Sequence, residues 1–147
     1  MSNDQTMATL YSVIKTLEAI ALGQPNVRSA GDGSLYDYMN GDPSVMYNVF
    51  FVTQNRHSTS LDLDYDIYNL NLFHITRLRD DKVNELEGES TSKEVLQNVI
   101  NRFCEQYDAD VVGTIEWQAF TEHFKDECCG MYATLKIRVP IDVICAE

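Results

Sequence analysis

Apolar residues recur at helical spacing in two segments of the chain. In residues 7–22 the apolar positions are Met7, Leu10, Val13, Ile14, Leu17, Ile20 and Ala21. In residues 91–107 they are Val95, Leu96, Val99, Ile100, Phe103, Cys104 and Tyr107. A stripe repeating every three or four residues covers one side of an α-helix. The pattern predicts two amphipathic helices, the first ending at Gly23 and the second beginning at a capping box formed by Thr91 and Glu94.

Two strands are predicted between these helices. Residues 45–53, "VMYNVFFVT", are β-branched and aromatic, and residues 61–72 alternate between apolar and polar positions. The apolar set of the second segment moves by one position halfway along, as at a β-bulge or in a long strand that swaps faces where it leaves the sheet. Turn residues fill the intervening "QNRHSTS". We predict a long hairpin over 45–78 whose tip carries Arg56 and His57 and extends beyond the core.

The last third of the chain predicts two further strands. A short one surrounds "TIEWQAF", with Ile115 and Trp117 on one side, and "FTEHFKDECCG" reads as a connector. Residues 131–139 then alternate regularly, with Met131, Ala133, Leu135, Ile137 and Val139 on one side and Tyr132, Thr134, Lys136 and Arg138 on the other. Pro140 lacks a backbone N–H, so we expect this strand to end there or to lie at an edge.

These elements predict a single α+β domain over residues 1–147. The order helix, two strands, helix, two strands favours a mainly antiparallel sheet covered by two main helices on one face. Residues 24–44 are rich in Gly, Asn, Asp and Ser, which predicts a long loop. Its two tyrosines, Tyr36 and Tyr38, could order it against a neighbouring molecule.

Composition narrows the functional classes. The chain has 147 residues, 44% of them hydrophobic, and 23 acids against 11 bases give a net charge of −12. No segment approaches the roughly 20 apolar residues that span a bilayer, and the N-terminus lacks the pattern of a secretory signal, so we expect an intracellular protein without membrane contact. Nucleic-acid affinity comes largely from basic residues, so sequence-specific nucleic-acid binding is not expected.

The stretch "RLRDDKVNELEGES", residues 77–90, is the most charged part of the chain. Exposed ion pairs contribute about 0–1 kcal/mol each, so stability does not explain it. Two-metal catalysis needs carboxylates from several elements, whereas these lie on one loop beside bases that neutralise them. Mixed charges suit specific docking. We predict that this docking loop lies at a subunit interface through Arg77, Arg79, Asp80, Asp81, Asn84, Glu85 and Glu87.

The sequence predicts no catalytic residue, cofactor or metal. None of His57, His74 and His123 lies in a recognisable nucleophile motif. The aspartates at 62, 64 and 66 lack the glycine and terminal glutamate of a calcium loop, and their spacing predicts one solvated strand face. A metal-dependent enzyme using the acidic loop stays open as a third alternative.

The four cysteines, Cys104, Cys128, Cys129 and Cys145, include no C-x-x-C pair. We expect reduced, partly buried thiols. A zinc site made by His123, Cys128, Cys129 and Cys145 is the alternative, although tetrahedral sites usually show ligand pairs at short regular spacing.

Two motifs resemble the tail terminator or tail completion-like proteins of tailed bacteriophages. The first is a charged loop between a strand and a long helix, matched by Leu78, Asp80, Asp81, Asn84, Glu85, Glu87 and Ser90. The second joins an aromatic–acid–aromatic run to a glycine and a last strand, matched by Phe120, Glu122, Phe124, Asp126 and Gly130. The resemblance extends from about residue 7 to residue 140, and it includes the ring proteins of short-tailed and crAss-like phages.

The resemblance implies a non-enzymatic virion protein that forms a homo-oligomeric ring in the neck or tail and is assembled in the host cytoplasm. Its neighbours would be portal, neck or tail proteins, with six-fold symmetry for a tail terminator and twelve-fold symmetry for a ring matched to the portal. Genomic DNA would pass through the channel without sequence-specific binding, and an acidic wall would not hold its phosphates. The alternative is a small acidic binding protein of the DNA-mimic type.

Overall fold

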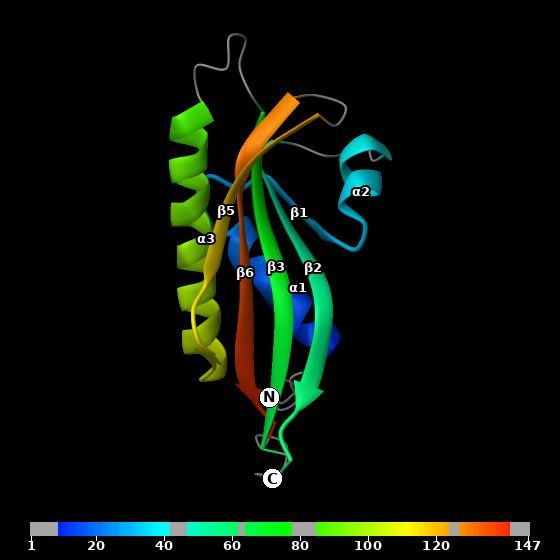
Figure 1. Ribbon diagram of the computed structural model, residues 1–147, viewed down its shortest axis with the longest axis vertical. Coiled ribbons are helices and arrows are strands. Elements are labelled where there is room, and N and C mark those ends of the chain that lie inside the picture. Colours follow the sequence, from blue (N-terminus) through cyan, green and yellow to red (C-terminus); the bar gives the residue numbers. More distant parts are fainter. Residues whose placement is uncertain (1–8, 42–46, 62–63, 78–84, 124–126, 142–147) are drawn as a thin grey trace.

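A computed structural model describes residues 9–41, 47–61, 64–77, 85–123 and 127–141 (Figure 1). The chain forms an α+β domain, as the order of patterns predicts. Its elements are α1 (Leu10–Leu22), β1 (Ser29–Asp32), α2 (Leu35–Gly41), β2 (Val49–Thr59), β3 (Tyr65–Arg77), α3 (Glu85–Tyr107), β4 (Asp110–Val111), β5 (Glu116–His123) and β6 (Glu127–Pro140).

The strands form one mixed sheet in which antiparallel pairing dominates. Its order is β1-β2-β3-β6-β4, and β5 also pairs with β6. The pairing of β1 with β2 is parallel, and all other pairs are antiparallel. Along β6, β3 occupies one side over the whole length, so β4 and β5 share the other side.

One face of the sheet is covered by α1 and α3, and the main core lies between them (Figure 1). The helices contribute Val13, Leu17, Ala21, Val95, Leu96, Val99, Ile100 and Phe103, and the strands contribute Phe50, Val52, Tyr68, Leu70, Leu72, Ala133, Leu135, Ile137 and Val139. This confirms the helical stripes, the end of α1 at Gly23 and the inward set of β6 apart from the half-buried Met131. We call this side the helix-covered face.

The predicted loop over residues 24–44 is wrong, because this segment contains β1 and α2. Here α2 packs on the other face of the sheet, near one end, where Met39 joins Val49, Ile75 and Cys128 in a second core cluster. The ring of Tyr38 lies 5.1 Å from that of Phe51, so this tyrosine orders the segment against its own sheet. Both elements are short, and their apolar partners lie far away in the sequence, so periodicity could not detect them.

The predicted hairpin forms, but its tip is elsewhere. Because β2 runs on to Thr59, Arg56 pairs with Asn69 and His57 with Tyr68 inside the ladder. The turn follows, and the hydroxyl of Ser60 accepts the backbone N–H groups of Asp64 and Tyr65 there. The sequence "QNRHST" looks like a turn because its residues are polar, and they are polar because this edge of the sheet is solvated.

The register shift lies in β2, between Gln54 and Arg56, and not in the second strand as predicted. The phase change of residues 61–72 has a different cause. The strand β3 begins only at Tyr65, and the exposed Leu61 precedes it in the turn. From Tyr68 to His74 its buried positions alternate, and Ile75 is buried as well.

The start of the second long helix was also predicted wrongly. Because α3 begins at Glu85, Thr91 lies inside the helix and forms no cap. Gly88, within the first turns of this helix, is needed for packing. A Cβ atom there would lie 2.9 Å from the Cγ2 atom of Thr76 and 3.1 Å from the Sγ atom of Cys129.

Much of the predicted connector before the last strand is a β5–β6 hairpin. Here β5 continues to His123, and β6 begins at Glu127 and ends at Pro140, as predicted for its end. The glycine of the second motif is required by close packing, since a Cβ atom at Gly130 would lie 2.0 Å from the carbonyl oxygen of His74.

Candidate functional site

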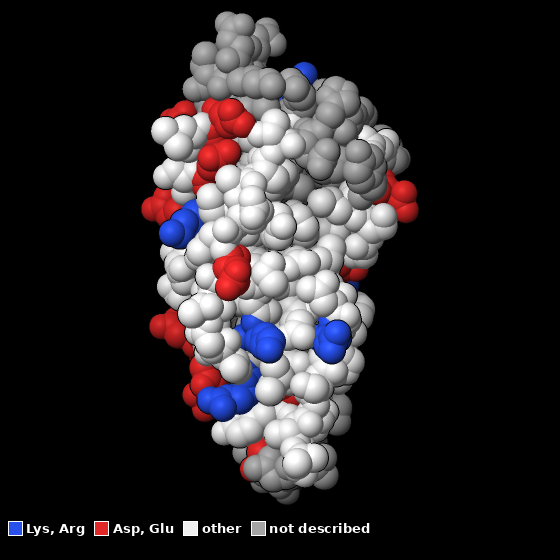
Figure 2. Space-filling model, in the orientation of Figure 1, with Lys and Arg blue, Asp and Glu red and all other residues white. Residues whose placement is uncertain are grey.

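The face of the sheet opposite α1 and α3 is only partly covered. While α2 covers the end near Val49 and Ile75, no other described element covers this face of the strands beyond it. We call this uncovered part the open face. Figure 2 shows it as a broad uncharged area with a few Lys and Arg side chains in the lower half and acidic side chains along the α3 side.

An aromatic cluster lies at the border between the end of the sheet that α2 covers and the open face, where Phe73 and Phe120 pack against the second core cluster. Phe73 stacks on Tyr132 with ring centroids 5.0 Å apart, and Phe120 lies 6.1 Å from Phe73 and 6.3 Å from Tyr132. All three side chains are partly exposed. Aromatic residues are enriched at the centres of protein interfaces because they bury a large area at low entropic cost. The cluster therefore has the composition of a binding surface.

Two cations of the open face lie at one level of the sheet, four residues along β6 from Tyr132. Arg56 of β2 and Lys136 of β6 both pair with Asn69 of β3, so they stand two strands apart, about 10 Å. Among the described residues neither makes an ion pair. They line a depression of about 680 Å³ whose wall also includes Glu116 and Thr134. These cations are therefore available to an acidic partner.

The third cation of this face is already neutralised. The guanidinium of Arg138 donates to Asp110 at 2.6 Å and lies 4.9 Å from the centre of the Tyr65 ring. It therefore contributes less than Arg56 or Lys136 to the attraction of a partner.

The predicted docking loop is only partly described. Arg79, Asp80, Asp81 and Asn84 lie outside the described residues, and the docking role of the loop stays a prediction. Arg77 ends β3, and Glu85 and Glu87 form the first turn of α3. The carboxylate of Glu85 accepts the hydroxyl of Thr121, which ties this turn to β5.

Arg77 and Glu87 line a smaller depression of about 430 Å³ at the end of the sheet. The structure thus brings these two docking residues together, whereas the Arg56 and His57 of the predicted tip lie on β2. The two predicted sets do not form one site.

A histidine–serine pair lies beneath this end of the sheet. The Nδ1 atom of His74 is 2.7 Å from the hydroxyl of Ser92, and its Nε2 atom is 2.8 Å from the carbonyl oxygen of Asn26. A carbonyl only accepts, so Nε2 carries the proton and Nδ1 accepts from Ser92. Burial lowers the pKa of His74, and a weaker effect of the Asn26 carbonyl raises it.

A serine bonded to a histidine nitrogen resembles a nucleophile with its base. Ser92 is fully buried, however, and His74 is 1% exposed, so a substrate has no access to the hydroxyl. The pair instead joins β3, α3 and the segment after α1.

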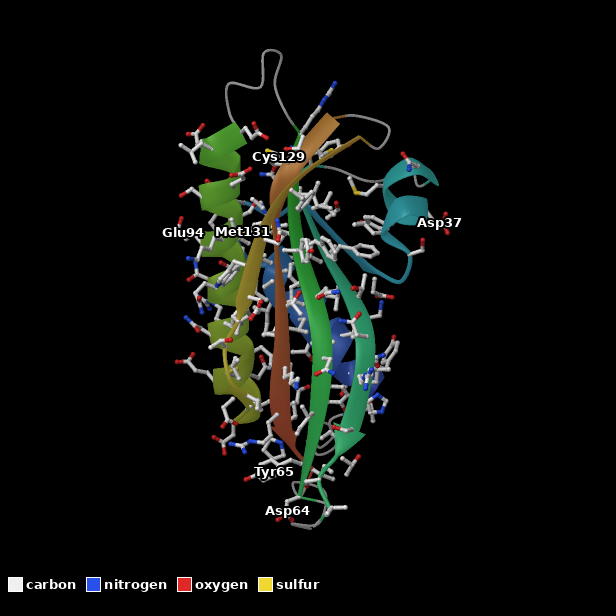
Figure 3. All side chains as sticks on the ribbon, in the orientation of Figure 1. Asp37, Asp64, Tyr65, Glu94, Cys129 and Met131 are labelled. Atoms are coloured by element: carbon white, nitrogen blue, oxygen red, sulfur yellow. The ribbon has the colours of Figure 1, made fainter. Side chains whose placement is uncertain are left out.

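The two adjacent cysteines point to opposite faces of β6. Cys128 lies in the cluster under α2, while Cys129 lies 3.9 Å from the backbone oxygen of Glu85 on the α3 side (Figure 3). Burial, aided by Glu85 and Glu89, raises the pKa of Cys129 to about 11, so its thiol is protonated. Cys104 is half-buried and Cys128 and Cys129 are buried, which agrees with the expectation of partly buried cysteines.

Because Cys128 and Cys129 point to opposite faces of β6, they are poorly placed to bind the same zinc ion, which argues against the zinc alternative. The side chain of His123 and all of Cys145 lie outside the described part of the structure. Within the described ranges, no three His, Cys, Asp or Glu side chains lie close enough to hold a metal ion.

Sequence reasoning missed one titratable pair, Glu18 of α1 and Asp32 of β1. The ammonium of Lys15 lies 3.1 Å from Asp32 and 3.5 Å from Glu18. Burial, together with Asp32, raises the pKa of Glu18 to about 7, and the hydrogen bond with Glu18 lowers that of Asp32. Glu18 occupies a position between apolar residues of the α1 stripe, which was the only signal available.

The aromatic cluster was missed as a site as well. Alternation predicts that Tyr132 points away from the main core, but only the register of three strands brings Phe73 and Phe120 beside it.

No protein-family model matches the chain, and no curated protein is similar to it. Among the described helices, none is long and apolar enough to cross a membrane.

Proposed function

We propose that this chain is a structural subunit of a ring in the neck or tail of a tailed bacteriophage particle. The ring joins the head to the tail, and the genome passes through its channel. The subunit performs no chemistry, and its function lies in binding copies of itself and the rings above and below. The observation that carries the proposal is the open face, where the described residues leave an aromatic cluster partly exposed and two cations without an ion pair.

The contrast within the sheet supports a role in assembly. The helices α1 and α3 cover one face of the sheet, whereas the other face keeps three aromatic rings partly exposed. Aromatic side chains with polar and charged residues around them mark interaction surfaces of proteins. A ring subunit needs such a surface for each neighbour.

The resemblance of the charged loop and of the Phe120–Gly130 motif to tail terminator proteins supports the phage context. The net charge of −12 suits a channel through which DNA must slide, because an acidic wall does not retain phosphates. On this proposal the protein is located in the virion.

Copy number in the particle tests the proposal. Particles purified on a density gradient and treated with nuclease are digested, and peptides of this chain are quantified by mass spectrometry against the major capsid protein. The proposal predicts a copy number that fits one ring, six for a tail terminator and twelve for a ring matched to the portal. Absence of the chain from purified particles would contradict it.

A second candidate function is a DNA-mimic binding protein. It is favoured by the outer side of α3, where the exposed Glu87, Glu94 and Glu105 form an acidic line along the helix. Absence from particles, combined with displacement of DNA from a purified basic protein, would support this alternative.

A further inference from the structure

The outer side of α3 carries an exposed leucine and an exposed acid one above the other. The buried residues of α3, among them Val95, Val99 and Phe103, face the sheet. With 3.6 residues per turn, Leu86, Ser90 and Glu94 lie on the solvent side, and all three are exposed. We call these three residues the outer ridge. Figure 3 shows Glu94 pointing away from the sheet.

The bases of α3 do not neutralise this ridge. Lys93 lies over the ring of Trp117, 5.4 Å from its centroid, and Arg102 lies on the side near α1, where it lines a depression with Ala19 and Gln24. Glu94 makes no ion pair within the described ranges.

The spacing of the outer ridge matches that of the open face. From Leu86 to Glu94 the helix rises about 12 Å, at about 1.5 Å per residue. From Tyr132 to Lys136 the strand β6 advances about 13 Å, at about 3.3 Å per residue. A helix laid along β6 therefore places an exposed leucine on the aromatic cluster when its glutamate reaches the cations.

Leu86 also supplies the apolar group that the aromatic cluster needs. It is one of the few large hydrophobic side chains that are exposed, at 79%. Contact with Phe73, Phe120 and Tyr132 would remove apolar area of both partners from water, at about 25 cal/mol per Å².

The charges of the two surfaces indicate how a second copy of the chain would bind. Two copies that each carry a net charge of −12 repel one another, so a contact between copies needs a local pairing of opposite signs. Arg56 and Lys136 supply the positive side, and Glu94 supplies the negative side. Glu116, the acid on the wall of the depression, favours an approach of Glu94 toward Arg56 and Lys136 rather than toward β5.

From these observations we infer that the open face binds the outer ridge of α3 of a second copy of this chain. The inference deepens the proposed function and rests on it, because it names the head-to-tail contact between neighbouring ring subunits. The two surfaces lie on different sides of the subunit, so one copy engages a neighbour through each. Such heterologous contacts close into rings when the rotation permits.

A charge-reversal experiment on the purified full chain tests the contact. The sheet variant is R56E/K136E and the helix variant is E94K; all three positions are exposed, and circular dichroism checks the fold of each variant. Sedimentation equilibrium up to about 1 mM, the range of weak contacts, measures self-association. We expect the wild type to associate, and we expect each variant alone to associate at least about tenfold more weakly.

The mixture of the two variants decides the result. Each variant restores the opposite charges that the other needs, so an equimolar mixture should regain the association of the wild type. The matched control is E105K, which makes the same charge change on α3 about 16 Å beyond Glu94 and should associate like the wild type.

The inference is overturned if the mixture associates no better than its components, if E105K weakens association as much as E94K, or if the wild type stays monomeric at about 1 mM. These outcomes separate the contact from the proposed function. A ring copy number in particles together with a failed mixture would place the ring contact elsewhere, whereas a restored mixture from a chain absent from particles would refute the phage role alone.

Discussion

The two faces of one sheet differ in what covers them. On the helix-covered face, Leu70, Leu72 and Ile137 are fully buried beneath α1 and α3. On the open face, their neighbours in the same strands, such as Phe73 and Tyr132, stay partly exposed. The comparison shows how one domain can separate its two tasks. The helix-covered face stabilises the fold, and the open face has the features of an interface.

The treatment of charge differs in the same way. The titratable groups beneath the helices are buried and have shifted pKa values, raised for Glu18 and lowered for His74. The cations of the open face, Arg56 and Lys136, are exposed to solvent. The stability of the fold should therefore depend on pH because of Glu18 and His74. Self-association should depend on salt because of Arg56 and Lys136.

The largest expected effect distinguishes the two faces by stability. Leu70→Ala, on the helix-covered face, should lower the free energy of unfolding by about 2–5 kcal/mol because it leaves a cavity in the main core. Thr134→Ala, on the open face next to it, should change stability by about 1 kcal/mol or less. Urea unfolding followed by the fluorescence of Trp117 measures both, and equal effects would remove the distinction.

The next largest effect concerns Glu18, whose side chain is 12% exposed. Its pKa is raised from 4.5 to about 7, so its contribution to stability is present below pH 4.5 and is lost as the pH rises through about 7. Glu18→Gln should therefore stabilise the protein by about 1–3 kcal/mol at pH 8. The gain should shrink toward zero as the pH falls to 5, and a gain that is the same at both values would rule out titration of Glu18 as its cause.

The histidine beneath the helices should act in the opposite direction. Burial lowers the pKa of His74, so its contribution is present above about pH 6.5 and is lost as the pH falls below that value. In the Glu18→Gln background, stability should fall between pH 6.5 and 5.5 by at most about 1.4 kcal/mol per pH unit. Urea midpoints that do not change over this interval would show that protonation of His74 does not lower the stability of the protein.

A substitution in the aromatic cluster should have a small effect on stability and a larger one on self-association. Tyr132→Ala removes one ring of the aromatic cluster and should cost about 1 kcal/mol of stability, because the ring is only partly buried. Self-association should weaken by roughly tenfold or more, as for a central interface residue. Tyr11→Ala, which removes a 72% exposed tyrosine from α1, is the control and should leave self-association unchanged.

The sequence predicted the parts of this structure that depend on long regular patterns. The stripes of α1 and α3 and the alternation of β6 each repeat over many residues, which fixes both the element and its buried side. The pattern failed where elements are short or polar. Nothing local distinguishes the β1 and α2 segment from a loop, and the solvated end of β2 has turn-like residues around Arg56.

The candidate site was predicted less well for a related reason. A charged run such as residues 77–90 is visible in the sequence, whereas the aromatic cluster exists only through strand register. Phe73, Phe120 and Tyr132 come from three strands that the chain visits in the order β3, β5 and β6. No property of a single segment predicts that these rings come into contact.

Photo-cross-linking from the open face tests the central claim most directly. p-Benzoylphenylalanine replaces Tyr132 in the full chain, the protein is irradiated at about 1 mM, and cross-linked peptides are identified by mass spectrometry. Mixing labelled and unlabelled chains shows whether a link joins two copies. Links between copies are expected from position 132 to the first turns of α3, around Leu86 and Ser90. Links between copies from position 132 to the same position, or no link between copies at all, would contradict it.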